Sequence, residues 1–169
     1  MQDRNQRARF ESMVVPHQAA AYNLARWLTG NDQDAEDVVQ EAYLRALRFF
    51  DNFHGIDGRS WILAIVRNAC YTWLRQNRRK PLALEDEMLE VPDTRPNPEA
   101  VHLAEIDQKM LRQAIEDLPD EFREAIILRE LEGLSYKEIG AITGAPIGTV
   151  MSRLARARQR LEKALGGVA

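Results

Sequence analysis

Residues 134–154 have the sequence LSYKEIGAITGAPIGTVMSRL, which predicts a helix, a turn and a second helix. Ser135 and Glu138 have the spacing of a capping box, in which two side chains satisfy the free backbone N–H groups at a helix start. Gly144 and Pro146 then interrupt the chain, because glycine commonly ends a helix and proline cannot continue one. The second helix is expected to begin directly after this proline, so the stretch is typical of a helix-turn-helix unit.

The second helix has an apolar side and a polar side. The apolar positions follow a 3-4-3-4 spacing and are expected in the core: Ile147, Val150, Leu154, Ala157 and Leu161. The polar side carries hydroxyl and guanidinium groups: Thr149, Ser152, Arg153, Arg156 and Arg160. An α-helix fits the major groove of B-DNA, where Arg can bind guanine or phosphate. The polar side therefore predicts a DNA-recognition face.

Two other interpretations of this stretch are weaker. An ordinary helical hairpin with a solvated basic face fits poorly, since none of the three arginines has an acidic residue four positions away. Glycines at 140, 144 and 148 suggest a phosphate-binding loop, but no strand precedes them and no Gly-Lys-Ser/Thr follows.

The rest of the chain also predicts an all-α protein, because apolar residues recur at spacings of three and four and strand patterns are almost absent. Four of the seven prolines fall within residues 81–98, together with five acidic residues. This composition disfavours a packed helix and predicts a flexible, acidic, Pro-rich linker over 81–102. The linker separates two small helical domains, over 8–80 and 103–166.

Three helical segments are expected in the first domain. The first covers 10–28 with an interruption at Pro16, and Gly30 ends it. The second follows a cap at Asp32 or Asp34 and leaves a polar face free for a partner. The third covers about 59–79, with an expected core side of Trp61, Ile62, Ile65, Ala69 and Trp73. Its basic end, Arg75, Arg78, Arg79 and Lys80, is explained equally well by helix capping and by phosphate binding.

Composition excludes several classes of protein. The 169 residues are 45% hydrophobic and 29% charged, a globular balance with no apolar stretch long enough for a membrane span and no signal peptide, so we expect a cytoplasmic protein without direct membrane insertion. One cysteine, Cys70, and three scattered histidines lack any metal-ligand spacing, so no metal, disulfide or cofactor is expected, and a buried thiol is favoured over a redox role. Serine and histidine lack a nucleophile motif, so no catalytic residue is assigned.

Local charge is uneven although the net charge is only −3. Residues 1–80 carry 12 Lys or Arg against 9 Asp or Glu, residues 81–120 carry 3 against 11, and residues 121–169 carry 8 against 6. Charge asymmetry alone is more often a property of solvated helix faces than of a binding site.

Two groups of segments resemble the sigma factors of bacterial RNA polymerase, specifically the extracytoplasmic-function (ECF) group of the sigma-70 superfamily. LPDEFREA at 118–125, EGLSYKEI at 132–139 and GTVMSRLARAR at 148–158 resemble the promoter-binding region 4. DAEDVVQEAYLRA at 34–46, with Ser60-Trp61-Ile62 and Arg67-Asn68, resembles region 2. The resemblance implies a factor that binds core RNA polymerase and directs it to specific promoters, under control of an anti-sigma factor.

The resemblance also implies three binding surfaces. Contact with the β′ clamp helices of the polymerase is implied for Asp37, Gln40, Glu41 and Arg45, and region 4 would meet the β flap. Contact with the minus-10 promoter element is implied for Arg67, Asn68 and Arg75, while a loop with Phe53, His54, Asp57 and Arg59 would hold an unstacked base. Contact with the minus-35 element is implied for Gly148, Thr149, Ser152, Arg153 and Arg156. The acidic linker would pass toward the RNA path.

Three positions depart from the family pattern: Thr72, Gly140 and Met151. Lys or Arg is common in the family at the position of Met151. The absence of a cation at 151 removes one expected DNA contact and alters the expected promoter preference.

The competing interpretation of the whole chain is a self-sufficient helix-turn-helix regulator whose first domain senses a signal or dimerises. Binding of duplex DNA by the protein alone would distinguish that regulator from a sigma factor.

Overall fold

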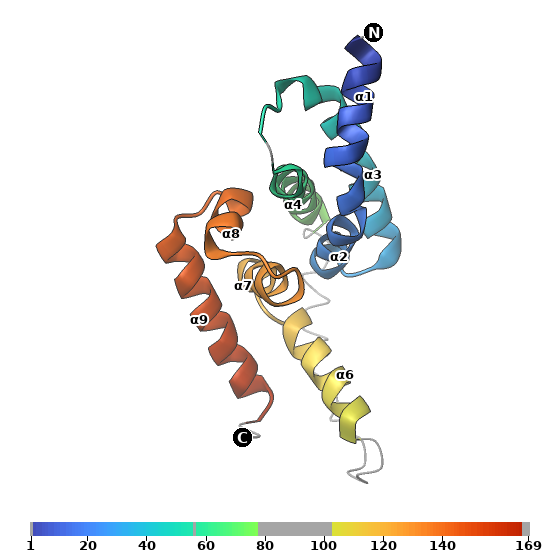
Figure 1. Cartoon of the computed structure of the whole chain (residues 1–169). Coiled ribbons are helices and arrows are strands. Elements are labelled where there is room, and N and C mark those ends of the chain that lie inside the picture. The colour runs from blue at the N-terminus through green and yellow to red at the C-terminus, as the bar shows by residue number, and fades with distance from the viewer. Residues whose placement is uncertain (1, 56, 78–102, 167–169) are drawn as a thin grey trace.

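The computed structural model describes residues 2–55, 57–77 and 103–166, and the elements within these ranges are all helical (Figure 1). The N-terminal bundle contains α1 (Gln2–Met13), the 3₁₀ turn η1 (Val15–His17), α2 (Gln18–Thr29), α3 (Asp32–Phe49), the 3₁₀ turn η2 (Phe50–Asn52) and α4 (Gly58–Asn77). The C-terminal bundle contains α6 (Leu103–Glu116), α7 (Asp120–Ile126), the π-helical turn η4 (Ile127–Leu131), α8 (Tyr136–Thr143) and α9 (Ile147–Ala164). The predicted all-α fold is confirmed, whereas the predicted linker and the basic residues 78–80 lie outside the described residues.

The turn between α2 and α3 depends on two residues with special backbone geometry. Gly30 ends α2 in the left-handed region at φ 94°, as the sequence predicts. Asn31 is the cap of α3, and its Oδ1 accepts a hydrogen bond of 2.8 Å from the backbone N–H of Asp34. The expected cap at Asp32 or Asp34 is therefore wrong, because the extended backbone that a capping residue needs occurs one position earlier.

The buried side of α4 differs from the expected one. Its fully buried residues lie one position further along the chain than most of those predicted: Ile62, Leu63, Val66, Cys70 and Leu74. Trp61, Ile65, Ala69 and Trp73 are only partly buried. The difference arises because α4 packs against α2 and α3 and also against α8 of the other bundle. A partner that is distant in sequence thus widens the buried side of this helix.

The helix-turn-helix has the predicted local structure. Ser135 and Glu138 form both hydrogen bonds of the capping box, and Gly144 ends α8 at φ 76°. At Gly140 a Cβ atom would lie 2.9 Å from the carbonyl oxygen of Ala145, so its small size allows a close approach to the turn. In α9 three of the five predicted core residues are buried, but Ile147 is 49% exposed.

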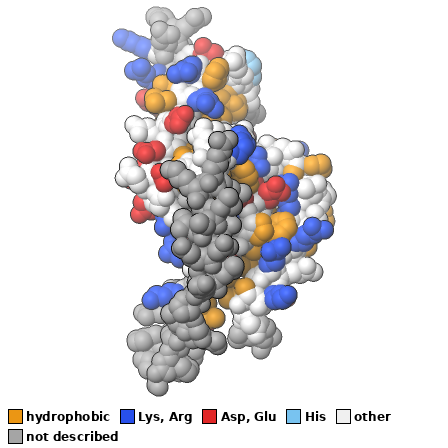
Figure 2. Space-filling view, turned by 180° about the vertical axis from the view of Figure 1, so that it is seen from behind, with side chains coloured by type: hydrophobic (Ala, Val, Ile, Leu, Met, Phe, Trp, Pro, Cys, Tyr) orange, Lys and Arg blue, Asp and Glu red, His pale blue; other side chains and the backbone are white. Residues whose placement is uncertain are grey.

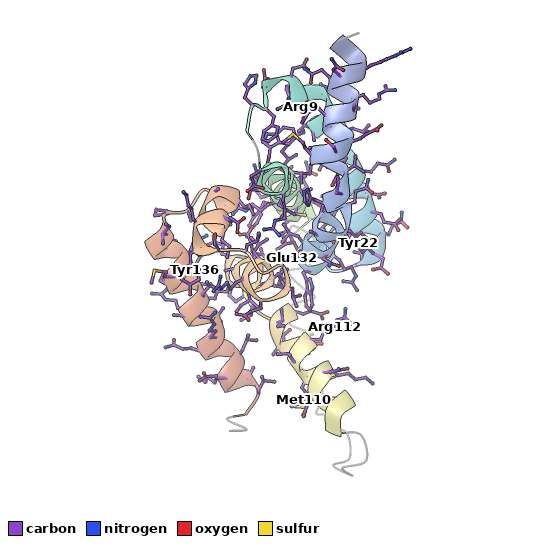
Figure 3. All side chains as sticks on the ribbon, in the orientation of Figure 1. Arg9, Tyr22, Met110, Arg112, Glu132 and Tyr136 are labelled. Atoms are coloured by element: carbon purple, nitrogen blue, oxygen red, sulfur yellow. The ribbon has the colours of Figure 1, made fainter. Side chains whose placement is uncertain are left out.

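The two bundles lie in direct contact. Figure 1 shows α7 beside α2 and α4, and contacts join α2 to α7 and α4 to α8. The buried apolar residues of both bundles form one continuous cluster. Arg112, labelled in Figure 3 where α6 approaches α2, places its guanidinium 5.6 Å from the ring centre of Trp27. The relative placement of the bundles decides which predicted site residues are accessible.

Candidate functional site

The N-terminal part of α9 presents most of the predicted recognition residues to solvent. Gly148, Ser152 and Arg156 are exposed, whereas Thr149 and Arg153 are half-buried. Figure 2 shows Lys and Arg side chains interspersed with hydrophobic ones on the side of the molecule that α9 forms. Pro146, Ile147 and Gly148 at the start of the helix are all exposed, so the helix N-terminus faces solvent.

Acidic and aromatic partners from other elements reach the arginines of α9. Arg153 pairs with Glu121 of α7 at 3.2 Å, and Arg158 pairs with Glu130 of η4 at 3.1 Å. Arg160 places its guanidinium 5.4 Å from the ring centre of Phe122. Within the described part of the chain no ion pair involves Arg156, which makes it the most available cation of the predicted set.

The loop before α4 is organised around Asp57. Its Oδ1 accepts a hydrogen bond of 3.0 Å from the Ser60 backbone N–H, and its Oδ2 accepts one of 2.6 Å from the Ser60 hydroxyl. Partial burial alone would raise the pKa of Asp57, but these hydrogen bonds hold it below the usual value. Asp57 thus acts as a cap for α4, while its neighbour His54 is exposed to solvent.

Phe53 lies in an aromatic cluster. It was expected in a loop that holds an unstacked base, and in this structure the residue is 7% exposed and stacks on Trp61 with the ring centres 4.8 Å apart. Its carbonyl accepts a 3.1 Å hydrogen bond from Arg9 of α1, whose guanidinium also lies 5.0 Å from the Phe50 ring centre. The apolar ring is buried because Phe50 and Trp61 pack against it and the Arg9 guanidinium lies 5.8 Å from its centre. The Phe53 ring thus faces the core, and the role of its loop in holding an unstacked base stays a prediction.

Arg67 is also held inside the molecule. It was expected to face promoter DNA, but its Nε donates to Glu124 Oε2 at 2.6 Å and its Nη2 approaches Glu124 Oε1 at 3.4 Å. The Tyr71 hydroxyl donates to the same Oε1 at 3.1 Å, and the guanidinium lies 4.1 Å from the Tyr71 ring centre. Burial raises the pKa of Glu124, while the bonds from Arg67 and Tyr71 oppose this rise. Glu124 was not found from sequence, because its role depends on a contact across 57 residues.

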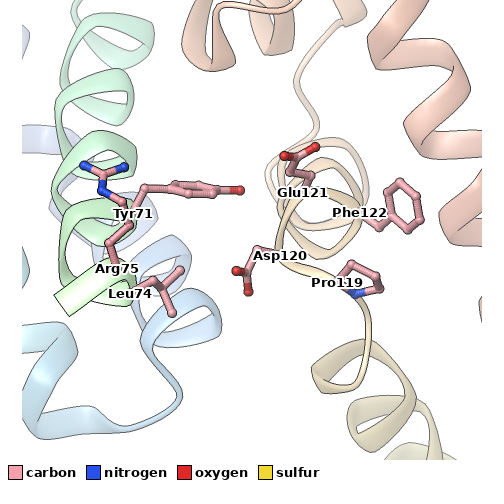
Figure 4. Close-up of a pocket in the computed structure, with 7 residues that line it drawn as sticks. All are labelled: Tyr71, Leu74, Arg75, Pro119, Asp120, Glu121 and Phe122. Carbon is pink, nitrogen blue, oxygen red and sulfur yellow. The ribbon is translucent and has the colours of Figure 1, made fainter. Parts of the chain in front are cut away.

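The remaining residues of the predicted minus-10 surface lie along α4. Arg59 is half-buried and pairs with Glu138 of α8 at 3.2 Å. Asn68 and Arg75 are exposed, and Arg75 donates to the Thr72 hydroxyl at 3.2 Å. Figure 4 shows the end of α4 facing the start of α7 across a pocket of about 540 Å³. The lining residues are Tyr71, Leu74, Arg75, Pro119, Asp120, Glu121 and Phe122.

The predicted polymerase-contacting residues lie together on α3, where Asp37, Gln40, Glu41 and Arg45 are all exposed. A groove of about 490 Å³ runs along the same helix and includes Gln40 in its lining. The groove was missed from sequence, although two large apolar residues on the polar side of α3 were a visible signal. These are Leu44, which is 60% exposed, and Leu47, which is 46% exposed.

Among the described residues, no group of three or more His, Cys, Asp or Glu side chains could hold a metal ion. None of the described helices has the length and apolar character to cross a membrane.

Comparison with known proteins identifies both bundles. Residues 13–80 match the family Sigma-70 region 2, and residues 108–161 match the family Sigma-70, region 4. The chain is 38% identical over 153 residues to the ECF RNA polymerase sigma factor SigE of Mycolicibacterium smegmatis, covering 90% of this chain and 60% of that protein. It is 36% identical over 163 residues to the ECF RNA polymerase sigma-E factor of Escherichia coli K12, covering 90% of this chain and 84% of that protein.

Solved structures show the same architecture. The sigma factor RpoE of Bartonella quintana, crystallised with the anti-sigma factor NepR, matches with a TM-score of 0.71 and 29% identity, over 95% of this chain and 98% of that one. CnrH, solved with the cytosolic domain of CnrY, shares the fold with a TM-score of 0.65 and 24% identity, over 95% and 89% of the two chains. The two regions in this order, together with 36% identity over 84% of the Escherichia coli sigma-E factor, show that the chain belongs to the ECF family of RNA polymerase sigma factors.

Proposed function

We propose that this sigma factor binds core RNA polymerase in the cytoplasm and directs it to two promoter elements at once. The observation that carries the proposal is the separation of surfaces: an exposed polar face with an apolar groove on α3, and an exposed basic face on α9. Residues 8–80 would form the domain for the polymerase and the minus-10 element, and residues 103–166 the domain for the minus-35 element. Residues 81–102 would be an acidic tether, which lets two weak DNA contacts act together.

The minus-35 element would be read as duplex DNA by α9. Gly148, Thr149 and Ser152 lie on the first two turns, where backbone and hydroxyl groups can reach bases or phosphates. Arg156 would add a charged contact without first losing an ion pair. Arg153 would have to leave Glu121 to do the same, so its net contribution to DNA affinity is expected to be smaller.

The minus-10 element would lie along α4 and the loop before it. His54, Asn68 and Arg75 offer exposed polar groups along one path. Arg59 and Arg67 would join them once their carboxylate partners on the C-terminal bundle are released. An unstacked base would then be held by polar edges of this loop rather than by the Phe53 ring.

The polymerase clamp helices would dock on α3. Asp37, Gln40, Glu41 and Arg45 supply hydrogen-bonding and charged groups at the rim, and the exposed leucines supply apolar area at the centre. Such an arrangement of an apolar centre and a polar rim is common in protein interfaces. The C-terminal bundle would meet the β flap.

An anti-sigma factor is the expected inhibitor, since RpoE of Bartonella quintana was crystallised with one. Covering α3 or separating the promoter-reading surfaces would each be enough to block initiation. The chain itself would do no chemistry, because nucleotide addition belongs to the polymerase.

The test is transcription in vitro from fragmented genomic DNA of the source organism, with core polymerase in the presence and absence of this protein. New transcripts with defined start sites, seen only when the protein is added, are the expected result. Their upstream sequences would give both promoter elements directly. Absence of transcripts, together with tight sequence-specific binding of duplex DNA by the protein alone, would instead indicate a self-sufficient regulator.

A further inference from the structure

A buried carboxylate from one bundle holds a cation of the other. Glu124 of α7 is 0% exposed, and the Arg67 side chain on α4 is 18% exposed. Arg67 Nε and the Tyr71 hydroxyl both donate to this carboxylate, at 2.6 Å and 3.1 Å. The Tyr71 ring also lies against the Arg67 guanidinium. Arg67 is thus fixed by a charge-assisted bond on one side and by stacking on another.

One weaker ion pair and one cation–π contact also join the bundles. Arg59 of α4 pairs with Glu138 of α8 at 3.2 Å, where both side chains are about one third exposed. Arg112 of α6 lies over Trp27 of α2. In each carboxylate pair the N-terminal bundle supplies the arginine and the C-terminal bundle supplies the acid. The C-terminal bundle therefore presents negative charge to α4, as a nucleic-acid backbone would.

A carboxylate and a phosphate compete for the same guanidinium. Both are anions with oxygens spaced for the fork of N–H donors on Arg, and Arg67 already uses its Nε and Nη2 donors on Glu124. Because Glu124 is fully buried against α4, DNA cannot reach these donors while the two bundles remain in contact. Closure of the chain and promoter contact by Arg67 exclude each other.

We propose that Glu124 is an internal competitor for promoter DNA, which keeps the free chain closed and inactive for minus-10 contact until polymerase separates the bundles. The proposal rests on the proposed role of Arg67 in minus-10 recognition. The coupling is reciprocal: whatever weakens the Glu124 contact raises DNA affinity, and DNA that captures Arg67 opens the chain.

Glu124→Gln is the decisive variant, because it keeps the size of the side chain but removes the charge that balances buried Arg67 and replaces one acceptor oxygen with a donor. Tyr71→Phe removes one hydrogen bond to the carboxylate and leaves every cation in place. Glu121→Gln is the matched control. It removes the same charge from the same helix, but its partner Arg153 belongs to its own bundle.

Opening is measured on the full chain with spin labels at Asp51→Cys and Glu162→Cys, two exposed positions on different bundles, by pulsed electron paramagnetic resonance. Affinity is measured in parallel by fluorescence anisotropy with a short labelled single-stranded DNA of mixed sequence, without polymerase. We expect Glu124→Gln to lengthen the distance between the labels and to bind this DNA at least about fivefold more tightly. Tyr71→Phe should change the label distance and the DNA affinity in the same direction, but by less. Glu121→Gln should match the unsubstituted chain in label distance, because it releases Arg153 without loosening the contact between the bundles, and any gain in its DNA affinity should therefore come without opening.

Three results would overturn the proposal. The label distance in Glu124→Gln could stay unchanged, the chain could open with no gain in affinity, or Glu121→Gln could produce the same opening. A variant that fails to fold is recognised by circular dichroism, and Tyr71→Phe then decides the question. Failure of the proposed function is detected separately, because it would appear as absence of polymerase-dependent transcripts with the unsubstituted chain.

Discussion

Glu138 uses its two carboxylate oxygens for two different tasks. Oε1 accepts a 2.8 Å hydrogen bond from the Ser135 backbone N–H and completes the capping box of α8, while Oε2 accepts a 3.2 Å bond from Arg59 of α4. One side chain thus determines where the helix-turn-helix begins and also joins it to the other bundle. The sequence predicted the first task, and the second depends on tertiary packing.

The capping box should give α8 a pH-dependent stability. The bond from the Ser135 backbone, together with Ser135 and Arg59 side-chain bonds, holds the pKa of Glu138 below its usual value despite partial burial. A carboxylate whose pKa is lower in the folded state than in the unfolded state stabilises the fold at pH values above its unfolded-state pKa. This stabilisation is lost as the pH falls through the folded-state pKa. Urea unfolding at neutral and acidic pH should therefore show that acidification lowers the free energy of unfolding less in Glu138→Gln than in the unsubstituted chain. An equal loss in both would contradict this role.

Removing the cap itself should destabilise the C-terminal bundle. Ser135→Ala is expected to cost about 1 kcal/mol, because the Glu138 backbone N–H loses its acceptor. Ser152→Ala is a suitable comparison, since that exposed hydroxyl bonds only to a carbonyl within its own helix. Equal free energies of unfolding for the two variants would rule out a capping contribution.

Gly58 should tolerate no side chain. A Cβ atom there would lie 2.0 Å from the carbonyl oxygen of Met13, so Gly58→Ala must displace the end of α1 or the start of α4. We expect a loss of about 1 to 3 kcal/mol in the free energy of unfolding. Gly148→Ala, which meets nothing within 4 Å, should leave stability unchanged or raise it slightly. Thermal unfolding of both variants tests the contrast.

Recognition of the minus-35 element should depend more on Arg156 than on Arg153. Arg156→Ala should weaken initiation by about 1 to 3 kcal/mol without affecting binding to core polymerase, as expected for a lost guanidinium contact. Arg153→Ala should cost less, because its DNA contact competes with Glu121. Comparing initiation on a promoter with and without its minus-35 element separates a loss of minus-35 recognition from a general loss of initiation activity. A larger loss for Arg153→Ala would reverse the assignment.

Polymerase docking should require both the rim and the groove of α3. Gln40→Ala with Glu41→Ala, and separately Leu44→Ala, should weaken binding to core polymerase, each by roughly 1 to 2 kcal/mol. Phe49→Ala is the control, since Phe49 is exposed on the same helix but outside the groove. Affinity for core polymerase is read by anisotropy of a labelled sigma factor. If Phe49→Ala weakened binding to core polymerase as much as Leu44→Ala does, the groove would contribute no more to this binding than other exposed apolar surface.

The Cys70 thiol should be unreactive in the folded chain. Burial, and to a lesser extent the nearby Glu124, raise the pKa of its thiol to about 12, so little thiolate exists at neutral pH. A thiol reagent should react slowly with the native protein and rapidly after unfolding. Fast reaction of the native chain would favour the redox role that the sequence left as the weaker interpretation.

Local features could be predicted well from the sequence. The capping box of α8, its end at Gly144 and the buried positions Val150 and Leu154 follow from spacing and from the backbone preferences of a few residue types. The end of α2 at Gly30 was predicted for the same reason.

Accessibility could not be predicted in this way. Phe53, Arg67 and Arg59 were placed on a DNA-facing surface, but an aromatic cluster buries the first and carboxylates of the other bundle bind the other two. Nothing near these residues in sequence signals such partners. The groove beside Leu44 likewise forms only when α1 and α2 pack beside α3.

The sequence by itself therefore determined the helices, their caps, the order of regions 2 and 4 and the family to which the chain belongs. These depend on local backbone preferences and on motifs within a few turns of helix. Only the tertiary structure decided that Glu124 holds Arg67 and that Arg156, unlike Arg153, is exposed and makes no ion pair with any described residue. Burial and ion pairing are properties of surfaces brought together over long sequence separations, and they decide which of the predicted residues are exposed to solvent.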